Sequence, residues 1–124
     1  MTRIALVEDN PDNRLLISLI LGDDYDVVEF EDGPAAVAGL AASGPDLVLM
    51  DISLPGMDGP DVLGHLREDP RTCHLPVVAL TAHAMVGDRE RYISMGFDGY
   101  VGKPIVDEMM LLDEVSGLLP GRVS

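Results

Sequence analysis

Short apolar segments recur along the chain, separated by stretches long enough for helices of about three turns. The apolar segments are Ile4–Val7, Val27–Phe30, Leu47–Met50, Val77–Leu80 and Tyr100–Val101. The first, third and fourth are continuously apolar, which is typical of strands buried on both faces. The second alternates with acidic residues and the fifth is short, so we expect these two at the edges of the sheet. The alternation predicts an α/β fold in which helices cover both faces of a doubly wound, five-stranded parallel sheet.

The helix boundaries are marked by proline, glycine and asparagine. Proline is favoured in the first helical turn, and glycine commonly follows the last one. The predicted helices begin at Asn10-Pro11, Gly33-Pro34, Gly59-Pro60, Ala84 and Val106, and they end near Leu21, Ser43, Asp69, Met95 and Leu119.

The length and composition indicate one globular domain. The chain has 124 residues, of which 47% are apolar and 24% charged. We therefore expect a single domain over residues 1–124, without an effector domain. Its longest apolar stretch, Leu15 to Leu21, is too short to span a bilayer, and no secretory signal precedes it. The single cysteine, Cys73, forms no internal disulfide. A cytoplasmic location is the expectation.

The charge distribution argues against nucleic acid and membranes as partners. Asp and Glu total 22 against 8 Lys and Arg, giving a net charge of −14. Because the cations are spread along the chain, no basic patch offsets the repulsion of phosphate backbones or anionic lipid. Seven of the eight cations are arginine, so Lys103 is the only lysine. Lysine and arginine are not interchangeable, and that exception points to a specific role.

Polar residues follow four of the predicted strands. Glu8 and Asp9 follow the first, Asp51 the third, Thr81 the fourth and Lys103 the fifth. In open α/β sheets, ligands bind at this carboxyl edge. Clustered carboxylates repel one another unless a cation lies between them, and oxygen ligands suit Mg²⁺. Lys103 and Thr81 are suited to hold an anion bridged by that metal.

Each of these residues also has an ordinary structural interpretation. A single Asp after a strand usually caps a helix or belongs to a turn. Thr81 alone is more often a cap than a ligand, and Lys103 before Pro104 is compatible with a solvated loop. The functional interpretation depends on the coincidence, because four of the five strand ends carry groups that complete one site.

Four motifs together resemble the receiver domain of two-component response regulators over nearly the whole chain. They are Leu6-Val7-Glu8-Asp9-Asn10, the segment Leu49 to Gly59, Ala79-Leu80-Thr81-Ala82, and Gly99-Tyr100-Val101-Gly102-Lys103-Pro104. In pattern the chain is most similar to single-domain regulators of the DivK type and to the receivers of hybrid kinases. The resemblance implies a (βα)5, flavodoxin-like or CheY-like fold with strand order 2-1-3-4-5.

The resemblance also implies a role for each site residue. Asp51 is the phosphoacceptor, and it ligates Mg²⁺ (Mn²⁺ is the alternative ion) together with Asp9, the Ser53 main-chain carbonyl and, through water, Glu8. Lys103 and Thr81 bind phosphoryl oxygens, and Tyr100 is the switch aromatic that follows Thr81. The Lys103-Pro104 bond is expected to be cis. Glu8 replaces the commoner Asp, which fits its water-mediated role, whereas Ser53 and His83 occupy variable positions that tune the acyl-phosphate lifetime.

Three functions compete. The first is a phosphorelay module, not an enzyme, which accepts a phosphoryl group from a histidine kinase or phosphotransfer protein and switches contacts with a downstream target. The second is a phosphatase similar to haloacid dehalogenases, although its nucleophile would end the first strand within a D-x-D pattern, whereas here that strand ends Glu8-Asp9-Asn10. The third is a receiver that no longer takes phosphate. The sequence leaves open whether the receiver is a stand-alone protein or part of a hybrid kinase.

The first predicted helix is apolar over more than half its circumference. The residues concerned are Leu15, Leu16, Ile17, Leu19, Ile20 and Leu21. This stripe is wider than packing on a sheet requires. We therefore expect either a surface for a histidine-bearing helix bundle, as the resemblance implies, or packing against the last helix.

Overall fold

A computed structural model describes residues 2–22, 24–82, 87–103 and 108–119. Its strands are β1 (Arg3–Val7), β2 (Asp26–Phe30), β3 (Leu47–Asp51), β4 (Val77–Thr81) and β5 (Gly99–Gly102). Its helices are α1 (Pro11–Leu21), α2 (Gly33–Ser43), α3 (Gly59–Glu68), α4 (Asp88–Met95) and α5 (Glu108–Leu118). No helix within the described ranges is long and apolar enough to cross a membrane.

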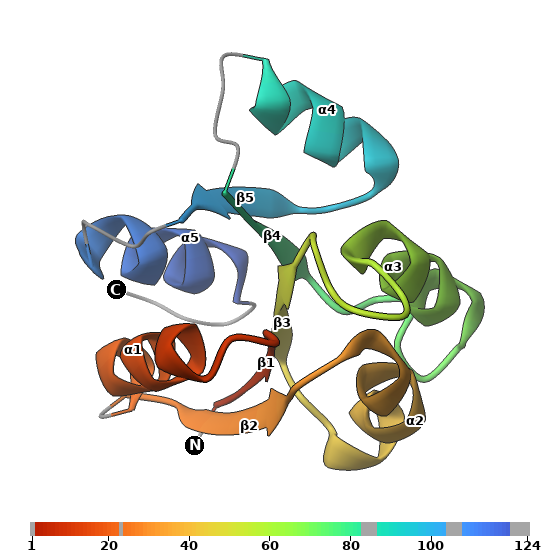
Figure 1. Cartoon of the computed structure of the whole chain (residues 1–124), viewed down its shortest axis with the longest axis horizontal. Helices are drawn as coiled ribbons and strands as arrows, with labels where there is room; N and C mark the ends of the chain where they lie inside the picture. Colours follow the sequence, from red (N-terminus) through yellow and green to blue (C-terminus); the bar gives the residue numbers. More distant parts are fainter. Residues whose placement is uncertain (1, 23, 83–86, 104–107, 120–124) are drawn as a thin grey trace.

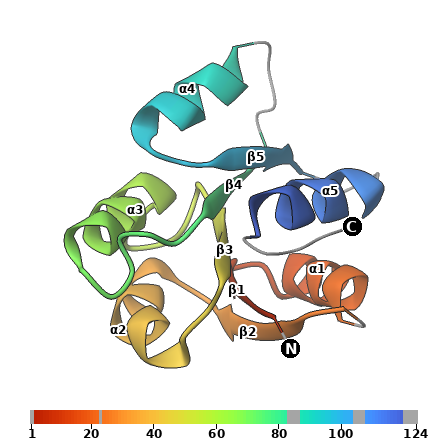
Figure 2. The same ribbon diagram turned by 180° about the vertical axis from the view of Figure 1, so that it is seen from behind.

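The strands form one parallel sheet in the order β2-β1-β3-β4-β5. β2 and β5 are therefore the edges, as their polar alternation and short length predict. Helices α1 and α5 cover one face of the sheet, α2 and α3 cover the other, and α4 lies beyond the β5 edge (Figures 1 and 2). The predicted fold class and strand order are confirmed.

The side chains of each central strand alternate between two separate apolar cores. Residues such as Val48 and Met50 pack with α2 and α3, whereas Leu47 and Leu49 pack with α1 and α5. Successive side chains of a strand point to opposite faces, so a strand buried on both faces must be apolar throughout. This requirement explains the uninterrupted apolar runs of β1, β3 and β4. Every residue of these three strands is buried except Arg3, at the start of β1.

The first three helices begin where the sequence predicts. Asn10 caps α1 by accepting hydrogen bonds from the backbone N–H groups of Asp12 and Asn13. Asp32 and Asp58 cap α2 and α3 in the same way, and each helix has proline in its first turn. These side chains satisfy N–H groups that have no partner inside the helix.

The fourth helix was predicted to run without interruption from Ala84 to Met95, and the conformation of Gly87 contradicts that continuity. Gly87 has φ of +92°, a left-handed conformation that cannot continue a right-handed helix, so α4 begins at Asp88. Ala84 itself and Val106, where the fifth helix was expected to begin, lie outside the described residues. The described part of α5 starts at Glu108.

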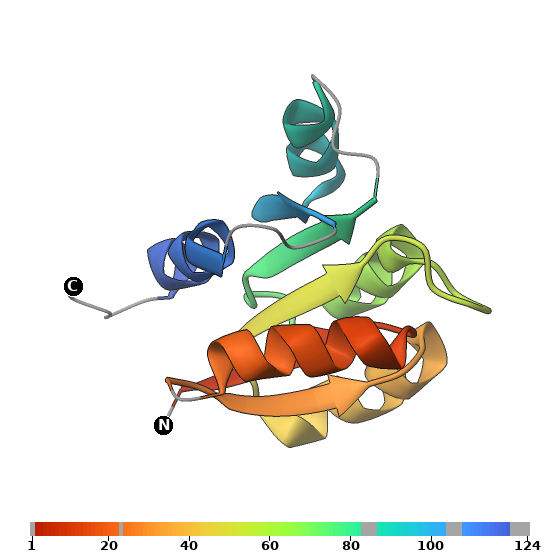
Figure 3. The same cartoon turned by 60° about the vertical axis from the view of Figure 1, so that its left-hand side comes forward.

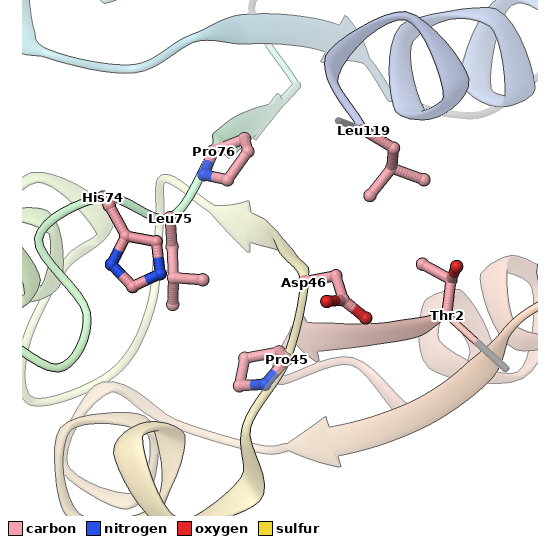
Figure 4. Close-up of a pocket in the computed structure, with 7 residues that line it drawn as sticks. All are labelled: Thr2, Pro45, Asp46, His74, Leu75, Pro76 and Leu119. Atoms are coloured by element: carbon pink, nitrogen blue, oxygen red, sulfur yellow. The ribbon is translucent and has the colours of Figure 1, made fainter. Parts of the chain in front are cut away.

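A cavity of about 260 Å³ lies at the amino ends of the strands (Figure 4). It is lined by Thr2, Pro45, Asp46, His74, Leu75, Pro76 and Leu119. Thr2, Asp46 and Pro76 directly precede β1, β3 and β4, so this cavity is at the opposite edge of the sheet from the predicted site.

Candidate functional site

The carboxyl ends of the parallel strands bring the predicted acidic residues together. All strands point the same way, so the residues after β1 and at the end of β3 meet at one edge (Figure 3). Each of Glu8, Asp9 and Asp51 offers a carboxylate oxygen within 4.8 Å of the others. Glu8 and Asp51 are buried, with exposures of 0% and 3%, whereas Asp9 is exposed.

Lys103 lies between the two buried carboxylates. Its Nζ donates to Asp51 Oδ2 at 2.9 Å and to Glu8 Oε1 at 3.1 Å. Its backbone N–H donates to the Thr81 carbonyl at 2.7 Å, which continues the β4–β5 pairing by one residue. Burial lowers the pKa of Lys103, but the hydrogen bonds to Asp51 and Glu8 outweigh it, so the pKa is raised and the ammonium form is favoured.

Glu8 is the most strongly perturbed carboxyl group among the described residues. Burial raises its pKa to about 7, and the neighbouring Asp51 carboxyl adds to the rise. The backbone N–H of Asn10, which donates to Oε2 at 3.2 Å, and the Lys103 ammonium oppose it. The Arg14 guanidinium holds the same turn by donating to the carbonyls of Glu8 and Asp9, at 2.8 and 3.2 Å.

Asp51 is oriented by the turn that follows β3. The Ser53 backbone N–H donates to its Oδ1 at 3.0 Å, which leaves Oδ2 to Lys103. The start of α3 packs tightly on the same turn: a Cβ added to Gly59 would lie 2.6 Å from the Asp51 carbonyl oxygen and 2.9 Å from Ile52 Cα. Only glycine permits this approach without a shift of the backbone. The role of the Ser53 carbonyl as a metal ligand stays a prediction.

Thr81 and Tyr100 lie on the neighbouring strands, as predicted, but Thr81 has a contact that the sequence did not indicate. Its Oγ1 is hydrogen-bonded to the hydroxyl of Tyr92 in α4, at 3.2 Å. Tyr100 is half-buried, and its ring lies 6.0 Å from that of Tyr92. No motif marks Tyr92, because a single tyrosine in a short helix looks like any core residue. The bond at Lys103-Pro104, and His83, lie outside the described residues.

The donor set fits a hard divalent cation. Three carboxylates converge within the 4.8 Å limit, and two of them are buried beside a single ammonium group. Removing like charges from water is costly unless a cation compensates them, and Mg²⁺ prefers such oxygen ligands while keeping several waters. The raised pKa of Glu8 has burial as its main cause and the neighbouring Asp51 carboxyl as its second, so a bound cation would favour the ionised form of Glu8.

A doubly wound sheet with an acidic cluster and a lysine at its carboxyl edge defines a CheY-like protein. The fold superposes on the chemotaxis protein CheY4 of Vibrio cholerae with a TM-score of 0.86 over 96% of this chain and 99% of that chain, at 24% identity. The response regulator receiver domain pattern matches residues 4–116. The chain belongs to this family, and it is a receiver domain of two-component signalling.

Relatives include both short regulators and parts of long proteins. The polar-differentiation response regulator DivK of Brucella anthropi is 40% identical over 82% of this chain and 84% of its own length. The response regulator PleD of Caulobacter vibrioides is 41% identical over 94% of this chain. The chain spans only 26% of PleD and 12% of the sensor protein GacS of Pseudomonas syringae, which is 40% identical.

One similar solved structure is a receiver domain that contains a metal ion. That of the sensor histidine kinase PA1611 from Pseudomonas aeruginosa has a TM-score of 0.84 and 34% identity over 94% of this chain and 96% of that chain. A magnesium ion is coordinated in its active-site cleft.

Proposed function

We propose that Asp51 accepts a phosphoryl group, and that the resulting change in the site switches contacts with a protein target. The observation that carries the proposal is the position of Asp51 Oδ2, 2.9 Å from the only lysine and within a cluster of three carboxylates. The arrangement supplies a nucleophile, a cation for the transferred group and an oxygen-rich metal site together.

The proposed reaction moves one phosphoryl group between two side chains. A carboxylate oxygen of Asp51 attacks the phosphorus of a phosphohistidine, the phosphorus–nitrogen bond breaks, and its electron pair stays on the imidazole. The product is an acyl phosphate at Asp51. Lys103 is placed to leave the Asp51 carboxylate and pair with a phosphoryl oxygen, while Thr81 donates to another. Tyr100 follows the movement of Thr81 in this scheme.

Glu8, Asp9 and Asp51, with the Ser53 carbonyl, would hold Mg²⁺ or Mn²⁺. When bound, the ion would neutralise negative charge on the transferring group. The Mg²⁺ reported for the PA1611 receiver supports this assignment for the present chain.

The proposed partners are proteins. A histidine kinase or histidine phosphotransfer protein is the phosphoryl donor, and a downstream protein reads the phosphorylated state. The net charge of −14 argues against nucleic acid and anionic membranes. In this scheme the domain acts in the cytoplasm as a module without a turnover substrate, and it needs no effector domain within residues 1–124.

Intact-mass measurement after incubation with acetyl phosphate and Mg²⁺ tests the phosphoacceptor. We expect one added phosphoryl group per chain, and we expect Asp51→Asn to abolish it because an amide oxygen is a poor nucleophile. Asp61→Asn, which changes an exposed aspartate in the first turn of α3, is the matched control and should be labelled like the wild type. Equal labelling of Asp51→Asn would refute the assignment.

A turnover assay separates this function from a phosphatase. A receiver should hydrolyse p-nitrophenyl phosphate no faster than its own acyl phosphate decays. Several turnovers per second would instead favour a haloacid-dehalogenase-like activity.

A further inference from the structure

Tyr92 of α4 contacts both residues of the proposed switch. Its hydroxyl is hydrogen-bonded to Thr81 Oγ1 at 3.2 Å, and its ring centroid lies 6.0 Å from that of Tyr100, with the ring planes inclined by 37°. The ring also makes an edge contact with Phe97, at 6.1 Å and 89°. The two ring contacts orient Tyr92 independently of its hydroxyl, so the hydroxyl is held against Thr81.

The attachment of α4 depends strongly on this tyrosine. Among residues 88–95, all of which the structure describes, Tyr92 alone is buried, with 4% exposure. The helix lies between two glycines with positive φ, and its N-cap residue, Gly87, has no side chain with which to cap the first turn. Arg89, one turn before Tyr92, lies over the Tyr100 ring at 5.9 Å and pairs with Glu114 of α5 at 3.3 Å, at an exposed position. Tyr92 therefore supplies the buried connection between α4 and the sheet.

Thr81 and Asp51 approach the site from opposite faces of the sheet. Thr81 continues the series Val77 and Ala79, whose side chains pack on the α2–α3 side together with Tyr92. Asp51 continues the series Leu47 and Leu49 on the α1–α5 side, because side chains alternate along a strand. A short threonine side chain must therefore turn away from Tyr92 to reach a phosphoryl oxygen on Asp51.

We propose that Tyr92 is a positioning residue that holds Thr81 away from the phosphorylation site, so that capture of a phosphoryl oxygen by Thr81 breaks the Thr81–Tyr92 hydrogen bond and loosens α4. The inference rests on the proposed function, since it requires a phosphoryl group at Asp51. A neutral hydrogen bond of this kind biases an equilibrium by roughly two- to tenfold. A ligand that binds only when the Thr81 side chain has turned toward Asp51 therefore has its affinity lowered by the same factor.

The test compares two Tyr→Phe variants. Tyr92→Phe deletes the hydroxyl and keeps the ring contacts with Phe97 and Tyr100. Tyr25→Phe is the matched control, because Tyr25 is also buried but lies in the other core, before β2. The measurement is the dissociation constant of beryllofluoride, an acyl-phosphate mimic, at saturating Mg²⁺, followed by amide NMR. We expect Tyr92→Phe to bind it roughly two- to tenfold more tightly than the wild type, and Tyr25→Phe to match the wild type.

Two further readouts distinguish a positioning role from a loss of stability. Three-bond couplings of the Thr81 methyl group should report one χ1 rotamer in the free wild type and an average in free Tyr92→Phe. Hydrogen exchange of the Asp88–Met95 amides should accelerate when beryllofluoride is added to the wild type, and should already be fast in Tyr92→Phe. A merely structural role would change the unfolding midpoint without changing the Thr81 couplings.

The outcomes are separable. Equal or weaker binding by Tyr92→Phe overturns the proposal, and weaker binding means that Tyr92 helps Thr81 donate to the phosphoryl group. A wild type that binds no beryllofluoride overturns the proposed function, and with it the release of α4. A wild type that binds it, with unchanged Thr81 couplings in Tyr92→Phe, overturns only the role of Tyr92.

Discussion

At the scale of single residues, Lys103 explains why one lysine stands in a chain whose other cations are arginine. Its ammonium fits between Asp51 and Glu8 and donates to both, at 2.9 and 3.1 Å. A compact point charge on a flexible stem can leave one oxygen for another, whereas a planar guanidinium needs room for its whole fork. For the proposed phosphoryl transfer, we therefore expect the site to need both the charge and the shape of lysine.

Lys103→Arg should separate phosphorylation of Asp51 from the conformational change that follows it. We expect the variant still to accept phosphate at Asp51 from acetyl phosphate, roughly tenfold more slowly because the reacting groups are displaced. We also expect it to lose the conformational response, since the guanidinium cannot follow the phosphoryl oxygen. Amide NMR spectra with and without beryllofluoride are the measurement. Shifts of wild-type size around Thr81 and Tyr100 would refute the coupling role.

The sequence predicted the charged residues of the site but not the hydrogen bond between Thr81 and Tyr92. Glu8, Asp51 and Lys103 follow strands, and strand ends of a parallel sheet meet whatever the intervening loops do. Tyr92 was missed because its role depends on how far a short helix stands from the β5 edge, and no local pattern encodes that distance.

At the level of secondary structure, the apolar residues of α1 divide into a buried group and an exposed group. Ile17 and Leu21 are buried with the α5 residues Leu111 and Val115, so the helix does pack on the α5 side of the sheet. Leu15, Leu16 and Leu19 are exposed to 61%, 38% and 70%. Core packing thus accounts for one stripe of α1 and leaves a second stripe facing solvent.

The exposed stripe of α1 should receive the phosphoryl donor. Asp substitutions at Leu15, Leu16 and Leu19, made one at a time, should lower the phosphotransfer rate from a cognate histidine phosphotransfer protein about tenfold at the most central position. The substitutions at Leu15 and Leu19 should change the free energy of unfolding by only about 0.5 kcal/mol, because these side chains are mostly exposed, whereas Leu16, at 38% exposure, should cost more. Met110→Asp, on the exposed side of α5, is the control and should transfer at the wild-type rate. Unchanged rates in all three leucine variants would place the surface elsewhere.

The boundaries of the elements were predictable where side chains determine them. Asn10, Asp32 and Asp58 are capping residues in the sequence and in the structure. The start of α4 was not predictable in the same way. Gly87 occurs within an apparently helical run, and only its left-handed φ shows that the helix begins after it.

At the scale of the whole molecule, the sheet order came from resemblance, since apolar runs identify strands but do not order them. Composition did predict which strands are central, because the runs Ile4–Val7 of β1, Leu47–Met50 of β3 and Val77–Leu80 of β4 contain no polar residue. Two cores on either side of one sheet then leave its carboxyl edge as the place where buried charges gather. The stability of the fold is consequently linked to the protonation of that edge.

The metal-free protein should lose stability as the pH rises from about 5 to 7. Glu8 has an ordinary pKa of 4.5 when unfolded and about 7 when folded, so between these values the folded state binds more protons. The free energy of unfolding therefore falls with rising pH, by on the order of 2 kcal/mol. Urea titrations in EDTA measure it. Glu8→Gln should flatten this dependence, whereas Glu68→Gln, at an exposed position of α3, should keep it; an unchanged slope in Glu8→Gln would contradict the assignment.

The placement of α1 and α4 has a consequence for the order of encounters. The two helices lie at different sides of the molecule, with α5 between them (Figure 1). A donor docked on the leucines of α1 leaves α4 uncovered unless it is broad enough to reach past α5. If the target of the proposed function binds at α4, it can therefore associate before the donor has dissociated, and donor, receiver and target can form one ternary complex.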